Sequence, residues 1–173
     1  MIIIVIPANN EEKTIRSVVS AVIDLVDKII VVNDGSNDNT SKLLSSLDVE
    51  IITNPKSIGY SKSIKIGINK AIQLGAKYII TMDGDGEHDA SMIHKMLKIL
   101  KRDRPLLIVA ERKYQPRISE SLYSLITNIL FGIRDITSGL KLYHVEIIKG
   151  LIHSKEVDDI ASLYAINALK QGV

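Results

Sequence analysis

Residues 77–89, KYIITMDGDGEHD, join a short apolar run to a loop rich in acidic side chains. The same pattern occurs twice earlier in the chain, where 2–6 (IIIVI) precede PANNEE and 28–32 (KIIVV) precede NDGSND. Short β-branched runs bounded by Gly, Pro, Asn and Asp predict buried strands. Each of these strands is therefore expected to end at a polar loop.

Helix-period stretches separate the predicted strands, so β and α elements alternate along the chain. Strands are predicted at 2–6, 28–32, 49–53, 77–82 and 106–110, and helices at 11–24, at 60–74 and after a capping Asp89. Strands that are apolar throughout are typical of parallel sheets buried under crossover helices. The predicted fold class is α/β, with a mostly parallel central sheet flanked by helices.

The composition fits one globular domain of 173 residues. Lys and Arg number 22 and Asp and Glu 20, and this net charge of +2 gives no reason to expect a nucleic-acid partner. The chain has no cysteine, so oxygen or imidazole would have to hold any metal, and a cytoplasmic location is expected. No apolar run reaches the roughly 18 residues of a spanning helix, so any membrane contact would be peripheral.

In an open parallel sheet, ligands bind outside the carboxyl ends of the strands, so the three acidic loops are expected to converge on one site. Asp83 and Asp85 can offer hard oxygen ligands to one Mg²⁺ or Mn²⁺, and a diphosphate would complete the shell. The alternative is a Gly-rich turn with solvated acids. A calcium loop is disfavoured because His88 and His94 stand where that loop needs Gly and Glu.

The loops that follow the first and second predicted strands indicate which class of ligand the site could bind. Residues 7–12 lack the glycines of a dinucleotide site, and no G-x-x-x-x-G-K segment occurs, which disfavours nicotinamide and P-loop sites. Asp34, at a strand end, could accept hydrogen bonds from a nucleoside. Taken alone, Asp34-Gly35-Ser36 is equally a tight turn before a helix capped by Asp38.

Five segments, in chain order, resemble motifs of the family 2 glycosyltransferases, which have the GT-A fold; the likeness is closest to the dolichol-phosphate mannosyltransferase-like branch. They are Ile6–Glu12, Val31–Thr40, Asn54 with Ile58-Gly59, Met82–His88 and Asp135–Tyr143. The resemblance implies an inverting transferase that moves a hexose from a nucleoside-diphosphate sugar to a polyprenyl (dolichyl-type) phosphate. It also implies a divalent cofactor, Mn²⁺ or Mg²⁺, held by Asp83 and Asp85.

The resemblance further implies roles for individual residues. Asp83, Asp85 and Arg112 would be catalytic, acting on the diphosphate or the acceptor. Substrate contacts are implied for Pro7, Asn10, Glu12, Asp34, Gly35, Ser36, Gly59, Glu87, Arg117, Ser138 and Gly139. Of these, Pro7, Asn10, Glu12 and Asp34 would hold the nucleoside.

Residues 112–173 are expected to form the acceptor side of a single domain, truncated at its C-terminus or of minimal length, and 1–111 the nucleotide-sugar side. Arg112 and Arg117 suit an anionic phosphate headgroup. The amphipathic pattern within 117–134 suits peripheral contact with the inner face of the membrane, with a protein core or the seam of a homo-oligomer as the alternative.

Transfer to a hydroxyl acceptor needs a carboxylate base, for which Asp158 and Asp159 are the nearest candidates. A phosphate monoester is largely ionised at neutral pH and attacks without one. The lack of a clear base therefore favours a lipid-phosphate acceptor.

Two rival functions remain. A nucleotidyltransferase is disfavoured because residues 7–12 are acidic rather than basic and Gly-rich. A nonenzymatic nucleotide-binding module would fit the departures from the family motifs at Asn9, Asn10 and Glu87.

Overall fold

The computed structural model of the protein describes residues 1–110 and 138–149. Within these ranges the core is a six-stranded sheet with the order β3-β2-β1-β4-β6-β5. The strands are β1 (Ile2–Ala8), β2 (Lys28–Asn33), β3 (Glu50–Thr53), β4 (Tyr78–Thr81), β5 (Leu107–Val109) and β6 (Lys141–His144). All five strands predicted from the sequence are present, and the α/β class is confirmed.

The first four strands are parallel, with β1 between β2 and β4. β6, which the sequence pattern did not predict, runs antiparallel to both β4 and β5. Its first residue, Lys141, pairs with Thr81 at the end of β4. The segment that leads into β6 is thereby placed beside the loop that leaves β4.

The register brings the ends of the parallel strands to one edge. Ala8 pairs with Asn33, and Asn33 pairs in turn with Thr53. From β1 the chain continues to β2 and β3 on one side of the sheet, and then crosses to β4 on the other side of β1. The boundary between β1 and β4, where the strand order reverses, is therefore the switch point of the sheet. Ligands of open α/β sheets bind at such a point.

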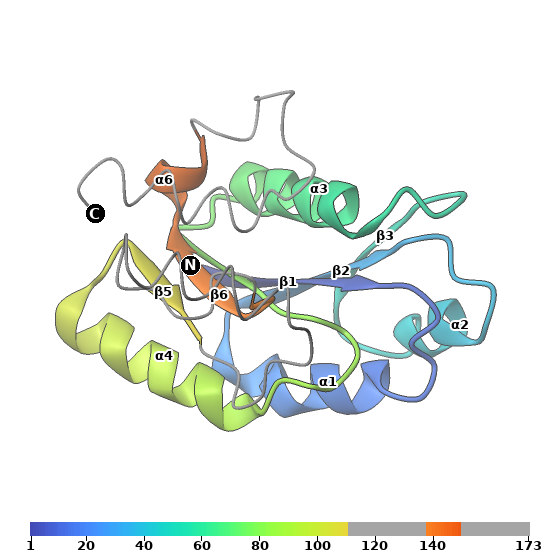
Figure 1. The fold of residues 1–173 in the computed structure, drawn as a ribbon, viewed down its shortest axis with the longest axis horizontal. Helices are drawn as coiled ribbons and strands as arrows, with labels where there is room; N and C mark the ends of the chain where they lie inside the picture. Colours follow the sequence, from blue (N-terminus) through green and yellow to red (C-terminus); the bar gives the residue numbers. More distant parts are fainter. Residues whose placement is uncertain (111–137, 150–173) are drawn as a thin grey trace, which may run out of the picture.

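Helices cover both faces of the sheet (Figure 1). They are α1 (Ile15–Val22), the 3₁₀ helix η1 (Ile23–Leu25), α2 (Thr40–Leu44), α3 (Tyr60–Gln73), α4 (Ala90–Asp103) and α6 (Val145–Lys149). α1 and α4 lie on one face, where Val19 and Ile93 share a buried cluster with Ile6. α3 lies on the other face, where Ile64 packs in a second cluster with Val5.

Three helix predictions can be compared with the structure at their starts, and α3 begins at Tyr60 as predicted. Asp89 caps α4 as expected, because its Oδ1 accepts a hydrogen bond of 2.8 Å from the backbone N–H of Ser91. α1 begins at Ile15 rather than at residue 11, and the backbone N–H groups of Glu11 and Glu12 donate to Thr40, at the start of α2, and to Asp38.

Some predicted features lie outside the described residues. The amphipathic segment within 117–134 is one of them, and the candidate bases Asp158 and Asp159 are others. The division at residue 112 stays a prediction. Across 1–110 and 138–149, no helix combines the length and apolar character needed to cross a bilayer.

Candidate functional site

The loops after β1 and β2 are bonded into one unit. The backbone N–H of Asn10 donates to Ser36 Oγ at 3.0 Å, and Asn10 Oδ1 accepts from the backbone of Asn37 at 2.8 Å. Glu12 Oε2 accepts from both the backbone and the side chain of Asn39, at 3.0 and 2.9 Å. Asn10 has a φ of 59°, a left-handed conformation that Asn tolerates better than most residues. Asn10, Glu12 and Ser36, all predicted to bind substrate, therefore lie together.

Asp34 joins the loop after β2 to the loop between β3 and α3. Its Oδ1 accepts from Asn54 Nδ2 at 2.8 Å and from the N–H of Ile58 at 2.9 Å. Its Oδ2 accepts from Ser57 Oγ at 2.8 Å and from the N–H of Gly59 at 2.9 Å. Burial raises the pKa of the Asp34 carboxyl, but these four hydrogen bonds outweigh burial and lower the pKa to about 2. Asp34 is thus a buried, ionised carboxylate.

Gly35 packs directly against the same β3–α3 loop. Its φ is +66°, and a Cβ placed on it would lie 2.5 Å from backbone atoms of Lys56 and Ser57. No rotation of a side chain relieves a contact with backbone. Only glycine therefore fits this position without moving the loop.

Asp83, at the switch point, is held by two side chains from different elements. The hydroxyl of Tyr60, the first residue of α3, donates to Asp83 Oδ1 at 2.7 Å. His88 Nε2 lies 3.1 Å from Asp83 Oδ2, and the His88 side chain is 3% exposed. Burial raises the pKa of the Asp83 carboxyl, but hydrogen bonds from His88 and Tyr60 and the nearby charge of Lys141 hold that pKa below its ordinary value. Asp83 is therefore ionised, with 26% of its side chain exposed.

The β4–α4 loop, which carries Asp83 and Asp85, contacts the segment before α1 and the segment before β6. Asp85 is exposed, and its Oδ1 accepts from the N–H of Glu87 at 2.9 Å. The carbonyl of Gly84 accepts from the hydroxyl of Thr14 at 2.8 Å, which fixes the loop to the one after β1. On the other side, a Cβ on Gly139 would overlap the Asp83 carboxyl group. The buried Ser138 precedes Gly139.

The structure brings most of the sequence-predicted residues to this edge of the sheet. These are Pro7, Asn10, Glu12, Asp34, Gly35, Ser36, Gly59, Asp83, Asp85, Glu87, Ser138 and Gly139. Arg112, Arg117, Asp158, Asp159 and the segment 117–134 lie outside the described residues. The binding role of each residue stays a prediction.

The sequence reasoning missed three residues that shape the site. Tyr60, His88 and Thr14 contact Asp83 or its loop, yet none had been assigned a role. His88 lies within the Met82–His88 motif, and Tyr60 directly follows the motif residue Gly59. For His88 and Tyr60 this position was the only available signal, and Thr14 carries no sequence signal.

The carboxylates fit a divalent ion. Asp83 is ionised and each of its oxygens accepts one hydrogen bond, which leaves a lone pair on each for a cation. Asp85 is exposed two residues away. The part of the chain that the structure describes contains no group of three or more acidic or histidine side chains arranged to hold a metal. Two carboxylates suffice for Mg²⁺ or Mn²⁺ when substrate phosphates and water supply the other ligands.

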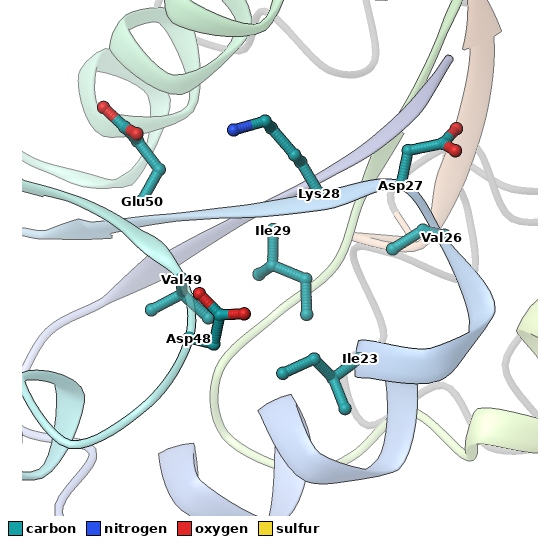
Figure 2. Close-up of a pocket in the computed structure, with 8 residues that line it drawn as sticks. All are labelled: Ile23, Val26, Asp27, Lys28, Ile29, Asp48, Val49 and Glu50. Atoms are coloured by element: carbon teal, nitrogen blue, oxygen red, sulfur yellow. The ribbon is translucent and has the colours of Figure 1, made fainter.

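A cavity of about 290 Å³ lies at the opposite edge of the sheet, where β2 and β3 begin. Figure 2 shows Asp27 and Glu50 on either side of Lys28. Asp27 accepts a hydrogen bond of 2.6 Å from the N–H of Ile2, and Glu50 pairs with Lys70 at 2.9 Å. These two carboxylates therefore stabilise the fold, and the cavity lies at the edge of the sheet opposite the candidate site.

The sheet places the chain in the class of open α/β proteins, with a candidate ligand site at the carboxyl edge of its parallel strands. The family model described as glycosyl transferase family 2 matches residues 3–151. The chain belongs to this family, and the resemblance found in its motifs is confirmed.

Two relatives are similar over most of the chain. A protein of Methanocaldococcus jannaschii described as uncharacterized is 33% identical over 86% of this chain and 74% of its own length. The UDP-N-acetylglucosamine–dolichyl-phosphate N-acetylglucosaminyltransferase of Methanococcus voltae is 30% identical over 87% of this chain and 72% of its own length.

Solved structures show the fold type. Glucosyl-3-phosphoglycerate synthase from Mycobacterium tuberculosis, crystallised with Mn²⁺, UDP and glucosyl-3-phosphoglycerate, superposes with a TM-score of 0.79 at 18% identity. The match covers 99% of this chain and 66% of that one, so this chain spans just under two thirds of the solved structure. At this identity the likeness shows the fold alone, which is the predicted GT-A type.

Proposed function

We propose that this chain is a metal-dependent inverting glycosyltransferase that moves a hexose from a nucleoside-diphosphate sugar to a polyprenyl (dolichyl-type) phosphate. The observation that carries the proposal is Asp83, an ionised carboxylate held at the switch point of the sheet with the exposed Asp85 beside it. Among the relatives, the M. voltae enzyme is named for a UDP-sugar and dolichyl phosphate. The structural neighbour was crystallised with Mn²⁺ and UDP.

The donor would lie across the four joined loops. We assign the nucleoside to the loops that carry Pro7, Asn10 and Glu12 after β1 and Asp34, Gly35 and Ser36 after β2. Gly59, Glu87, Ser138 and Gly139 border the diphosphate and sugar. Asp83 and Asp85 would hold Mn²⁺ or Mg²⁺, which when bound neutralises charge on the departing nucleoside diphosphate.

The acceptor would approach from the side formed by 112–173. We assign its phosphate to Arg112 and Arg117, and membrane-surface contact to 117–134. An ionised phosphate attacks the anomeric carbon without a general base. Replacing both Asp158 and Asp159 by Asn should therefore leave transfer to a polyprenyl phosphate mostly intact, and a collapse of turnover would contradict this acceptor.

The test combines binding with transfer. Calorimetry with UDP, GDP and other nucleoside diphosphates, with and without Mn²⁺, should show one base bound more tightly when Mn²⁺ is present. Asp85→Ala should abolish the Mn²⁺-dependent part of that affinity, whereas Asp48→Ala, an exposed acid at the opposite edge, should not. Incubation of the sugar nucleotide with dolichyl phosphate should then yield a glycosylated lipid by mass spectrometry. Tight binding without transfer to any acceptor would favour a nonenzymatic module instead.

A further inference from the structure

Lys141, the first residue of β6, is a cationic side chain enclosed by the fold. It is 0% exposed, and it is among the largest fully buried side chains of the described residues. Lysine is almost never fully buried in proteins unless it is paired, because removing an ammonium group from water is costly. Water and salt screen a buried charge much less than a surface charge. The charge of Lys141 therefore acts strongly on the groups around it.

Strand pairing places Lys141 on the same side of the sheet as Asp83. Lys141 pairs with Thr81 across β4 and β6, and paired side chains point to the same face. Tyr143, two residues after Lys141, lies on the α3 face, where it belongs to the second buried cluster. Asp83 follows Thr81 by two residues and is bonded to Tyr60, the first residue of α3. Lys141 and Asp83 therefore share the α3 side of the switch point.

Lys141 contributes little to holding Asp83 in place. Burial raises the pKa of the Asp83 carboxyl, and hydrogen bonds from His88 and Tyr60 lower that pKa more than the charge of Lys141 does. These two bonds, of 3.1 and 2.7 Å, should keep the carboxylate oriented if the Lys141 charge is removed. Such a removal would mainly change the net charge that a ligand meets. The single positive charge of Lys141 offsets half of the negative charge of Asp83 and Asp85.

We propose that Lys141 weakens the binding of a bare divalent cation to Asp83 and Asp85 and strengthens the attraction for a diphosphate, so that the site takes up its metal together with the nucleotide. The inference rests on the proposed function, because it takes both carboxylates to be metal ligands. A positive charge repels Mn²⁺ or Mg²⁺ and attracts the phosphates. Lys141 thus selects the charge of what binds, and it is neither a metal ligand nor a catalytic residue.

The experiment measures two affinities separately on the whole chain. Electron paramagnetic resonance follows Mn²⁺ alone, and calorimetry without metal follows UDP or GDP, whichever binds more tightly. Lys141→Met removes the charge and keeps an unbranched side chain. It should bind Mn²⁺ alone about tenfold more tightly and the nucleotide alone about tenfold more weakly, because the lost charge acts on the two ligands in opposite directions. The affinity for both ligands together should change less than about threefold, since the two effects offset each other.

Three variants control for folding and for charge elsewhere. Lys141→Gln also removes the charge and should shift both affinities in the same directions, which keeps the test available if Lys141→Met does not fold. Lys141→Arg retains the charge and should bind both ligands as the wild type does. Lys28→Met is the matched control: Lys28 also begins a strand, but it is exposed at the opposite edge of the sheet, and its replacement should change neither affinity.

The opposite signs separate this role from a structural one. A lysine that only supports the fold would, when replaced, weaken Mn²⁺ and nucleotide binding together, and that result would overturn the proposal. Unchanged Mn²⁺ affinity in both Lys141→Met and Lys141→Gln would overturn it as well, while the proposed function would stand. By contrast, a wild-type chain that binds the nucleotide no more tightly with Mn²⁺ than without it would refute the metal site of the proposed function itself.

Discussion

Asp34→Asn should lower the free energy of unfolding and remove part of its dependence on acid pH. The pKa of Asp34 is about 2 in the folded chain, against an ordinary value of 3.8. Because the folded-state pKa is depressed, the carboxylate contributes stability that is fully present above about pH 4. That contribution is lost as the pH falls through the folded pKa near 2.

The size of the effect follows from the pKa difference. One pKa unit is equivalent to about 1.36 kcal/mol, so the difference between the ordinary and the folded-state pKa of Asp34 corresponds to about 2.5 kcal/mol of folding stability. Ser57 and Gly59, two of the four donors, are exposed, so water screens part of this interaction. A contribution of about 1–2 kcal/mol is the expected value after screening.

Urea unfolding followed by circular dichroism, at pH values between 2 and 7, checks this prediction. The wild-type chain should be more stable than Asp34→Asn above pH 4, and the gap should narrow between pH 4 and pH 2. Ser57→Ala, which keeps the carboxylate but removes one donor, should give an intermediate slope. A stability gap of constant size across this window would refute the assignment of the low pKa to the four hydrogen bonds.

Three further substitutions test packing at the site and around it. Gly139→Ala should reduce Mn²⁺-dependent nucleotide affinity at least tenfold in calorimetry, because its Cβ would displace the Asp83 carboxyl; unchanged affinity would count against the site. Gly67→Ala should cost about 1–3 kcal/mol in urea unfolding, because the new methyl would overlap Val5 under α3, and a stabilised variant would contradict the packing. Asp89→Ala should cost about 1 kcal/mol by removing the α4 cap, whereas Asp89→Asn should retain most of it.

The sequence predicts most of the sheet because its signals are local. Each parallel strand is a short apolar run, and each ends at polar residues that can be read directly from the chain. β6 escaped prediction because Lys141–His144 begins with a lysine, which interrupts the apolar pattern and yet is fully buried in the structure. The start of α1 escaped because Glu11 and Glu12, which precede it, bond to Thr40 and Asp38, residues 26 to 29 positions further along the chain.

The sequence predicts where in the fold the candidate site lies, but not which hydrogen bonds connect its residues. The rule that ligands bind at the carboxyl edge of a parallel sheet predicts from the sequence alone that Asp34 and Asp83 lie on one side of the sheet. It could not reveal that Asn54 and Gly59, 20 and 25 residues further on, would occupy the Asp34 carboxylate. Pairings at such separations depend on how strands and loops pack, which no local pattern encodes.

The hydrogen bonds also explain why the separate motifs depend on one another. Asp34 in the second motif holds the loop that begins with Asn54 and ends with Gly59, which form the third. Tyr60, directly after that loop, reaches Asp83 in the fourth. A change in any one segment therefore alters the geometry of the next. The carboxylate at the switch point is oriented by residues whose own positions depend on a buried acid two strands away, so nucleotide and metal affinity should be lost together when Asp34 is replaced.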